Sequence, residues 1–210
     1  MKYFYFIFLL STEILFSQNS DAGLYEILKK SLSSETKKTL YDTLTYKSNL
    51  LTYEVRQPRE SKKFGIIDEY INKDFIQFDF EFYTNGEVKI DYDVKHLSLD
   101  FISILKTEYY YTEGMPSPST IQSTINVIKF QDKLFQVELS EYDNKKLIEQ
   151  LLFEDINKEC TDEIKQSCCT VNLLFENGNI KIINPLQSKY CKFNLSLADS
   201  NLTYKFLKIQ

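Results

Sequence analysis

The sequence predicts an α+β fold dominated by a mostly antiparallel sheet that is built from hairpins. Apolar and polar residues alternate in several segments, which is the period of a half-buried strand, and these segments come in pairs around short turn sequences. Apolar residues at helical spacing are confined to two segments near the N-terminus and one near residues 143–157. Strands and helices do not alternate along the chain, so a doubly wound parallel sheet is not expected.

Two N-terminal helices are expected. The first covers residues 21–32, where Asp21 can cap the helix and four apolar residues share one face: Leu24, Ile27, Leu28 and Leu32. The second runs from Ser34, its cap, to about residue 47, with Leu40 and Leu44 on its buried side. A strand at residues 50–57 then ends at Pro58, and residues 56–63 form a charged loop.

The clearest hairpin joins residues 76–82 to residues 88–94, because both segments alternate strictly. Directly opposed residues must share a face of the sheet, so the turn between them must hold three residues, Thr84 to Gly86. Such a turn needs Gly86 in the left-handed conformation, with a bulge. The same register places Asp79 opposite Asp91 on the polar face.

The middle of the chain adds a strand at residues 96–105, with a helix as the alternative because of the apolar pairs at residues 101–102 and 104–105. A loop at residues 114–118 follows Tyr109, Tyr110 and Tyr111. We expect one domain over residues 18–210, or two subdomains that meet near residues 112–120. A hairpin of residues 125–130 and 134–139 comes next, around a turn at residues 131–133.

The last part of the chain begins with the helix at residues 143–157, which turns Leu147, Ile148, Leu151, Leu152 and Ile156 inward. A hairpin of residues 170–176 and 179–183 turns at Asn177-Gly178, and here parity favours a two-residue turn with Phe175 opposite Ile180. Strands at residues 190–197 and 202–209 complete the prediction.

Residues 1–17 have the pattern of a cleaved signal peptide: Lys2, an apolar run at residues 3–10, and the small residue Ser17 before the cleavage point. Glu13 interrupts the apolar stretch, which leaves a buried amphipathic helix or a retained anchor as alternatives. An anchor is disfavoured because spanning a bilayer takes about 20 apolar residues. We therefore expect a secreted or periplasmic protein with no transmembrane anchor after cleavage.

The four cysteines, Cys160, Cys168, Cys169 and Cys191, lie in the last quarter of the chain. In an exported protein they are expected to form disulfides, and strand parity favours Cys169–Cys191 and Cys160–Cys168 among the three connectivities. The alternatives are reduced thiols and a metal site. Zinc ligands usually have two to four residues between them, and Cys168 and Cys169 are adjacent.

Three groups of residues are candidates for chemistry. His96 is the single histidine, and no nucleophile motif accompanies it, so we expect a structural role. Asp79 and Asp91, if opposed, would form a cation site, a carboxylate pair that shares a proton, or simply a solvated face, which we favour. Tyr109, Tyr110 and Tyr111, with Tyr83 and Tyr92, would form either an aromatic platform for a sugar or peptide or ordinary packing, which we favour.

The net charge of −5 argues against nucleic acid as a partner, and Arg56 and Arg59 are the only arginines. The abundance of lysine, isoleucine, asparagine, tyrosine and phenylalanine is typical of an AT-rich, bacterial genome. We expect no cofactor. The leading hypothesis is an exported, non-catalytic protein that binds a protein or small ligand through a sheet face or through residues 109–119. The alternatives are an exported hydrolase that uses Asp79 and Asp91, and an envelope component that self-associates through strand edges.

Overall fold

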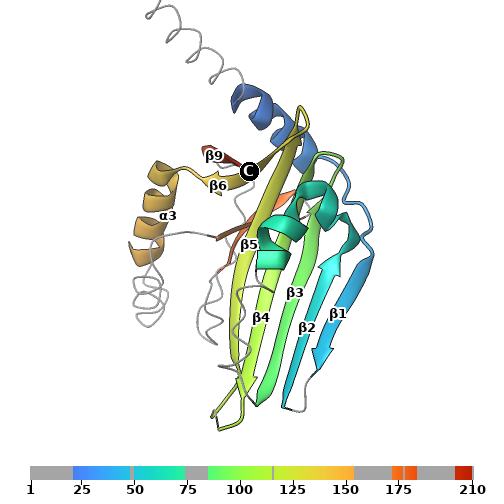
Figure 1. Ribbon diagram of the computed structural model, residues 1–210. Coiled ribbons are helices and arrows are strands. Elements are labelled where there is room, and N and C mark those ends of the chain that lie inside the picture. The colour runs from blue at the N-terminus through green and yellow to red at the C-terminus, as the bar shows by residue number, and fades with distance from the viewer. Residues whose placement is uncertain are drawn as a thin grey trace, which may run out of the picture.

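The centre of the molecule is a long, twisted seven-stranded sheet in the order β1-β2-β3-β4-β5-β6-β9, with a separate two-stranded sheet, β7-β8 (Figure 1). The structure is a computed structural model, and it describes residues 21–47, 50–73, 85–114, 116–153, 172–176, 178–183 and 202–209. Neighbouring strands of the large sheet are antiparallel, except that β2 and β3 are parallel. The prediction of an α+β fold with a mostly antiparallel sheet is therefore confirmed.

The elements follow the chain with these bounds. The strands of the large sheet are β1 (Tyr41–Lys47), β2 (Leu51–Pro58), β3 (Gly86–Leu97), β4 (Phe101–Thr112), β5 (Ser119–Phe130), β6 (Lys133–Leu139) and β9 (Tyr204–Lys208). The small sheet consists of β7 (Asn172–Glu176) and β8 (Asn179–Ile183). The described helical segments are residues 21–32, the 3-10 helix η1 (Arg59–Phe64), the π-helix η2 (Ile67–Ile71) and α3 (Glu141–Phe153).

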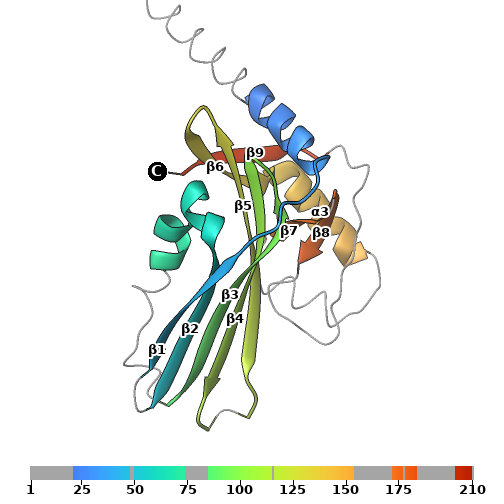
Figure 2. The ribbon, with the colours of Figure 1, turned by 90° about the vertical axis from the view of Figure 1, so that its right-hand side faces the viewer.

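The large sheet separates two hydrophobic cores, one on each of its faces. Helices η1 and η2 cover one face, and the β7–β8 hairpin lies against the other (Figure 2). The first core joins η1 and η2 to β2, β3, β4 and β5 through residues that include Tyr53, Phe64, Ile66, Val88 and Ile104. The second core joins the N-terminal helix, the β7–β8 hairpin and the ends of β4, β5 and β6 through residues that include Leu24, Leu28, Phe101, Ile128 and Phe175.

The second predicted helix, at residues 34–47, is wrong, because β1 occupies Tyr41–Lys47 and pairs with β2. Leu40 and Leu44 are four residues apart, and this spacing keeps two side chains on one face in a helix and in a strand alike. The β-branched Thr43 and Thr45 between the apolar residues favour the strand. Neither leucine is buried, since their exposed fractions are 55% and 50%.

The predicted turn at Thr84–Gly86 also differs from the structure. Gly86 begins β3, and the described glycines with positive φ are Gly65, Gly114 and Gly178. The reason for a glycine at position 86 is close packing, because a Cβ there would lie 2.0 Å from the backbone oxygen of Tyr111 on β4. Both edges of β3 are occupied over Gly86–Asp91, by β2 and β4, so the predicted hairpin partner has no place there. That partner, residues 76–82, lies outside the described residues.

Three connecting segments differ in detail from the prediction. The strand expected at residues 96–105 is divided at residues 98–100, where the Ser98 hydroxyl accepts a hydrogen bond from the Phe101 amide at 3.1 Å. The charged loop expected at residues 56–63 is the end of β2 followed by η1, which ends at the left-handed Gly65. The β5–β6 turn has two residues, Gln131 and Asp132, both with positive φ, where three were predicted.

The C-terminal elements lie close to their predicted places. Phe175 pairs with Ile180 in the β7–β8 hairpin, so the predicted register is confirmed. Helix α3 begins at Glu141, where Ser140 and Asp143 form a capping pair, and Leu147 is buried. The strand predicted at residues 202–209 is β9. The strand predicted at residues 190–197 lies outside the described residues, as do residues 154–157 of the predicted helix.

Candidate functional site

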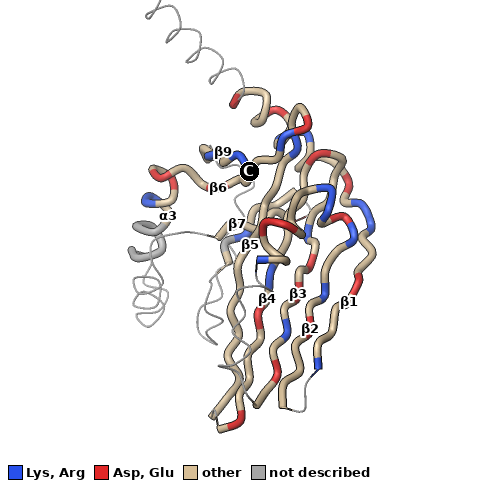
Figure 3. The backbone as a smooth tube through the Cα atoms, in the orientation of Figure 1, with Lys and Arg blue, Asp and Glu red and all other residues tan. Residues whose placement is uncertain are grey.

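The face of the sheet that is opposite the first core carries a row of polar side chains, which we call the polar face. Residues alternate between the two faces along each strand, and the apolar members of β2 and β3 belong to the first core. The polar face therefore holds Thr52, Glu54 and Arg56 of β2; Glu87, Lys89, Asp91, Asp93 and Lys95 of β3; and Thr107, Tyr109 and Tyr111 of β4. Figure 3 shows both signs of charge interspersed along β1–β4.

Arg56 and Asp91 form the central ion pair of the polar face. They lie directly opposite each other on the parallel strands β2 and β3, and Arg56 Nη1 donates to Asp91 Oδ1 at 2.6 Å. The guanidinium also lies 3.7 Å from the centroid of the Tyr41 ring on β1. One of the two arginines of the chain is therefore held on two sides by its own fold.

A second group of bonds links β1 to β3 and then to the β7–β8 hairpin. The Tyr41 hydroxyl donates to Asp93 at 3.2 Å and accepts a hydrogen bond from the Val94 amide at 3.0 Å. Lys95 lies 2.7 Å from Asp93 and 4.0 Å from Glu176 of β7, and its hydrogen bond to Asp93 raises the pKa of Lys95. Glu176 also pairs with Lys181 of β8. The polar network thus positions the hairpin against the sheet.

The structure does not place a second carboxylate opposite Asp91. The residues directly opposite it on the two neighbouring strands are Arg56 and Thr107. Asp79 lies outside the described residues. A shared-proton pair requires two adjacent carboxylates, whereas the neighbour of the Asp91 carboxylate is the Arg56 guanidinium. The geometry around Asp91 gives a structural ion pair and no support for acid–base catalysis.

The three consecutive tyrosines divide between the two faces. Tyr109 and Tyr111 lie on the polar face, opposite Lys89 and Glu87, and Lys89 Nζ is 6.0 Å from the Tyr109 ring centroid. Tyr110 faces the first core, where its hydroxyl donates to Glu108 at 3.2 Å. Tyr92 is buried in the first core, and Tyr83 lies outside the described residues. A continuous platform of all these rings is therefore not formed, but Tyr109 and Tyr111 share one open surface.

His96 is fully buried at the end of β3, where the sequence had placed it at the start of a strand. Its Nε2 lies 2.9 Å from the Ser31 carbonyl oxygen, and its Nδ1 lies 3.1 Å from the Thr36 hydroxyl. A carbonyl can only accept, so Nε2 carries the proton and Nδ1 accepts from Thr36. Burial lowers the pKa of His96. The imidazole has a structural role, as expected.

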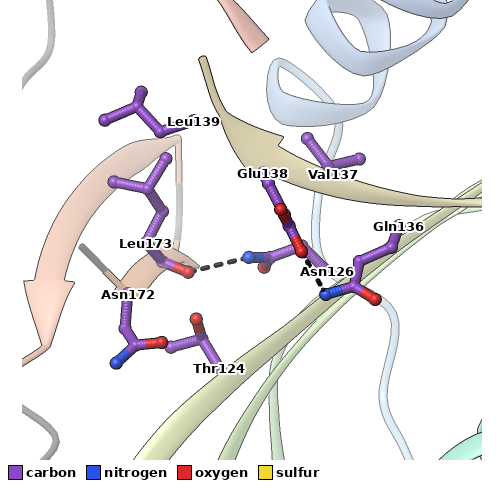
Figure 4. A pocket seen from close by; sticks show the side chains of 8 residues that line it. All are labelled: Thr124, Asn126, Gln136, Val137, Glu138, Leu139, Asn172 and Leu173. Carbon is purple, nitrogen blue, oxygen red and sulfur yellow. Dashed lines mark hydrogen bonds between the residues drawn. The ribbon is translucent and has the colours of Figure 1, made fainter. Parts of the chain in front are cut away.

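A small cavity of about 60 Å³ lies between β5, β6 and β7 (Figure 4). It is lined by Thr124, Asn126, Gln136, Val137, Glu138, Leu139, Asn172 and Leu173. A cavity of this size has room for a few waters. Its polar groups bind one another: Asn126 Nδ2 donates to the Leu173 oxygen at 2.8 Å, and Gln136 Nε2 donates to Glu138 at 2.8 Å.

Asn126 is the residue of this region that sequence reasoning missed. It accepts from the Ser103 hydroxyl at 2.7 Å, and that hydroxyl in turn accepts from the Phe175 amide at 3.0 Å. Both side chains are buried. The sequence does carry a sign of this pair, because Ser103 and Asn126 are each a polar residue between two apolar residues of a predicted strand. The pair attaches the β7–β8 hairpin to β4 and β5.

All four cysteines lie outside the described residues, as do residues 1–17. Within the described residues, no group of three or more His, Cys, Asp or Glu side chains is arranged to hold a metal ion. In the same part of the chain, no helix has the length and apolar character needed to cross a membrane.

The comparisons with known proteins find distant structural likeness only. No protein-family model matches the sequence, and no curated protein matches it. Among solved structures, a DUF3298 family protein from Pseudomonas aeruginosa PAO1 aligns with 85% of this chain and 92% of its own, at 13% sequence identity and a TM-score of 0.37. A likeness at this level carries no argument about the function of the present chain.

Proposed function

We propose that the protein is exported and acts without catalysis, binding a polypeptide partner on the polar face of its sheet. The observation that carries this proposal is the row of half-exposed tyrosine, threonine and charged side chains on β2, β3 and β4. The β7–β8 hairpin contacts this row near Lys95, and Tyr111 at the far end is 38% exposed.

The composition of the polar face favours a polypeptide over a polyanion. Its lysines and arginine are already paired with carboxylates, so it offers no cationic stripe for phosphates. Tyrosine combines a broad apolar ring with a polar hydroxyl, and it is enriched where proteins bind each other. The Lys89–Glu87 pair is exposed to solvent, which screens the attraction between the two charges, so it can exchange partners at little cost.

Photo-crosslinking tests the assignment of the polar face. A photoreactive phenylalanine analogue replaces Tyr111 in one variant and Tyr142 in a matched control, because Tyr142 is 75% exposed and lies on α3, outside β2, β3 and β4. We expect an adduct of defined mass from position 111 in exported material, absent from position 142, and weakened by Tyr109→Ala. Equal labelling at both positions, or none at 111, would contradict the proposal.

An intact mass of the exported protein tests the compartment. A signal peptide that ends at Ser17 predicts a mature chain that begins at Gln18, and two disulfides make it four hydrogens lighter than the reduced chain. A full-length mass with free thiols would overturn the export proposal and would leave the polar face to be tested in another compartment.

A further inference from the structure

Strand β1 forms an open edge of the large sheet. It is the terminal strand in the sheet order, and every residue from Asp42 to Lys47 is exposed. Four of the exposed large hydrophobic residues in the described part of the chain lie on or beside it: Leu40, Leu44, Tyr46 and Leu50. An exposed edge strand presents unpaired backbone groups that can pair with another strand. β1 contains no proline, and its charges, Asp42 and Lys47, lie near its ends.

The backbone groups that point outward from β1 can be assigned. The Arg59 amide donates to the Leu40 oxygen at 2.9 Å, so position 40 bonds toward β2. In an antiparallel ladder the bonded pairs alternate, so residues 42, 44 and 46 also bond toward β2. A second bond supports this assignment. The Gly86 amide donates to the Leu50 oxygen at 2.8 Å, so the backbone groups of the even-numbered residues in β2 point toward β3 and those of the odd-numbered residues point toward β1. Tyr41, Thr43, Thr45 and Lys47 therefore direct their amides and carbonyls to the open edge.

We propose that two copies of this chain pair through β1, antiparallel, around a two-fold axis that passes between their Leu44 side chains. A two-fold axis perpendicular to the sheet places the same face of both copies on the same side. Residues that lie directly opposite each other must therefore both be even-numbered or both be odd-numbered. Full overlap of the seven residues then sets Thr43 opposite the second copy's Thr45, and Tyr41 opposite its Lys47. All of these residues have outward backbone groups, so the register supplies hydrogen bonds along the entire strand.

The side chains of β1 complement themselves in this register. Leu44 contacts the second copy's Leu44, which buries a side chain that is 50% exposed in one copy. In the same register Asp42, which is bound to Arg59 of its own copy at 2.9 Å, lies opposite the second copy's Tyr46, so no like charges are directly opposed. The result is a continuous fourteen-stranded sheet, twice the seven strands of one copy. This pairing does not depend on partner binding at the polar face.

Cysteine cross-linking of the full chain tests the register. Leu44→Cys places two thiols in a pair without backbone hydrogen bonds, where the Cα atoms are about 4.5 Å apart, within the range of a disulfide. Thr45→Cys is the matched control, because position 45 faces position 43 of the second copy. We expect a dimer mass on oxidation of Leu44→Cys, and only the background of the unmodified chain from Thr45→Cys. Cross-linking of Thr45→Cys as efficient as that of Leu44→Cys would overturn the register.

Sedimentation velocity tests the pairing itself. The unmodified chain should show a dimer that dissociates on dilution. Leu44→Lys and Leu44→Glu should each be monomeric, because like charges then meet at the axis, and mixing the two variants should restore a dimer. Circular dichroism checks that both variants fold, which is expected at an exposed position. A monomeric unmodified chain at every concentration, or a dimer that both charge variants retain, would overturn the proposal.

Discussion

His96 is the single histidine of the chain, and both of its ring nitrogens are used inside the fold. Its neighbours are Ser31, in the last turn of the N-terminal helix, and Thr36, in the segment that follows, so the imidazole attaches both to the end of β3. Phe101 packs beside the ring at a centroid distance of 5.9 Å. These two hydrogen bonds fit the neutral form of the imidazole.

The buried imidazole predicts a loss of stability at mildly acidic pH. Burial lowers the pKa of His96 in the folded state, so the unfolded chain binds the proton first as the pH falls. The stabilisation is present above about pH 6.5 and declines as the pH falls from there toward the folded pKa. Urea midpoints measured across this window should decrease for the unmodified chain, with a shallower decrease for His96→Gln. An identical slope in both proteins would assign the effect to other groups.

At the scale of elements, the sequence predicts best where the decisive contacts are local. The β7–β8 hairpin has the predicted register because a two-residue turn and strand parity leave one solution. Helix α3 begins near its predicted start because Ser140 and Asp143 form a capping pair within four residues. In both cases the interacting residues are close neighbours in the chain.

The pairing of β2 with β3 was beyond sequence reasoning because it is parallel and joins strands that are far apart in the chain. Periodicity gives the faces of a strand but not its neighbour. The hairpin rule therefore assigned β3 an adjacent partner, and with it the pair Asp79 and Asp91. The observed partner of Asp91, Arg56, lies 35 residues earlier in the sequence. The division of the consecutive tyrosines was predictable, since strand alternation alone separates Tyr110 from Tyr109 and Tyr111.

At the scale of the whole molecule, the two cores differ in how far apart in the sequence their residues lie. The buried members of the first core lie between Leu51 and Val127, whereas the second core collects residues from Leu24 to Ile180. The two ends meet where the Tyr25 hydroxyl donates to the Tyr204 oxygen at 3.1 Å and accepts from the Tyr204 amide. Its ring packs edge-on against Phe206.

Tyr25→Phe should therefore loosen one core and leave the other unchanged. The variant keeps the ring contacts but leaves the Tyr204 amide and oxygen without their partner, at a cost of about 1–3 kcal/mol. Hydrogen exchange should speed up at residues 21–32 and in β9, while β2, β3 and β4 keep their protection. Tyr142→Phe, at an exposed ring, is the control. A uniform increase across both cores would show that the molecule opens as a single unit.

The contact between Tyr25 and Tyr204 also sets an order of events during synthesis. The N-terminal helix leaves the ribosome first, but much of the surface that it packs on, the β7–β8 hairpin and β9, is made last. The buried described residues of the first core, in contrast, have all been made once residue 127 has emerged. The packing of the earliest described helix is therefore completed only when β9, at the other end of the chain, has been made.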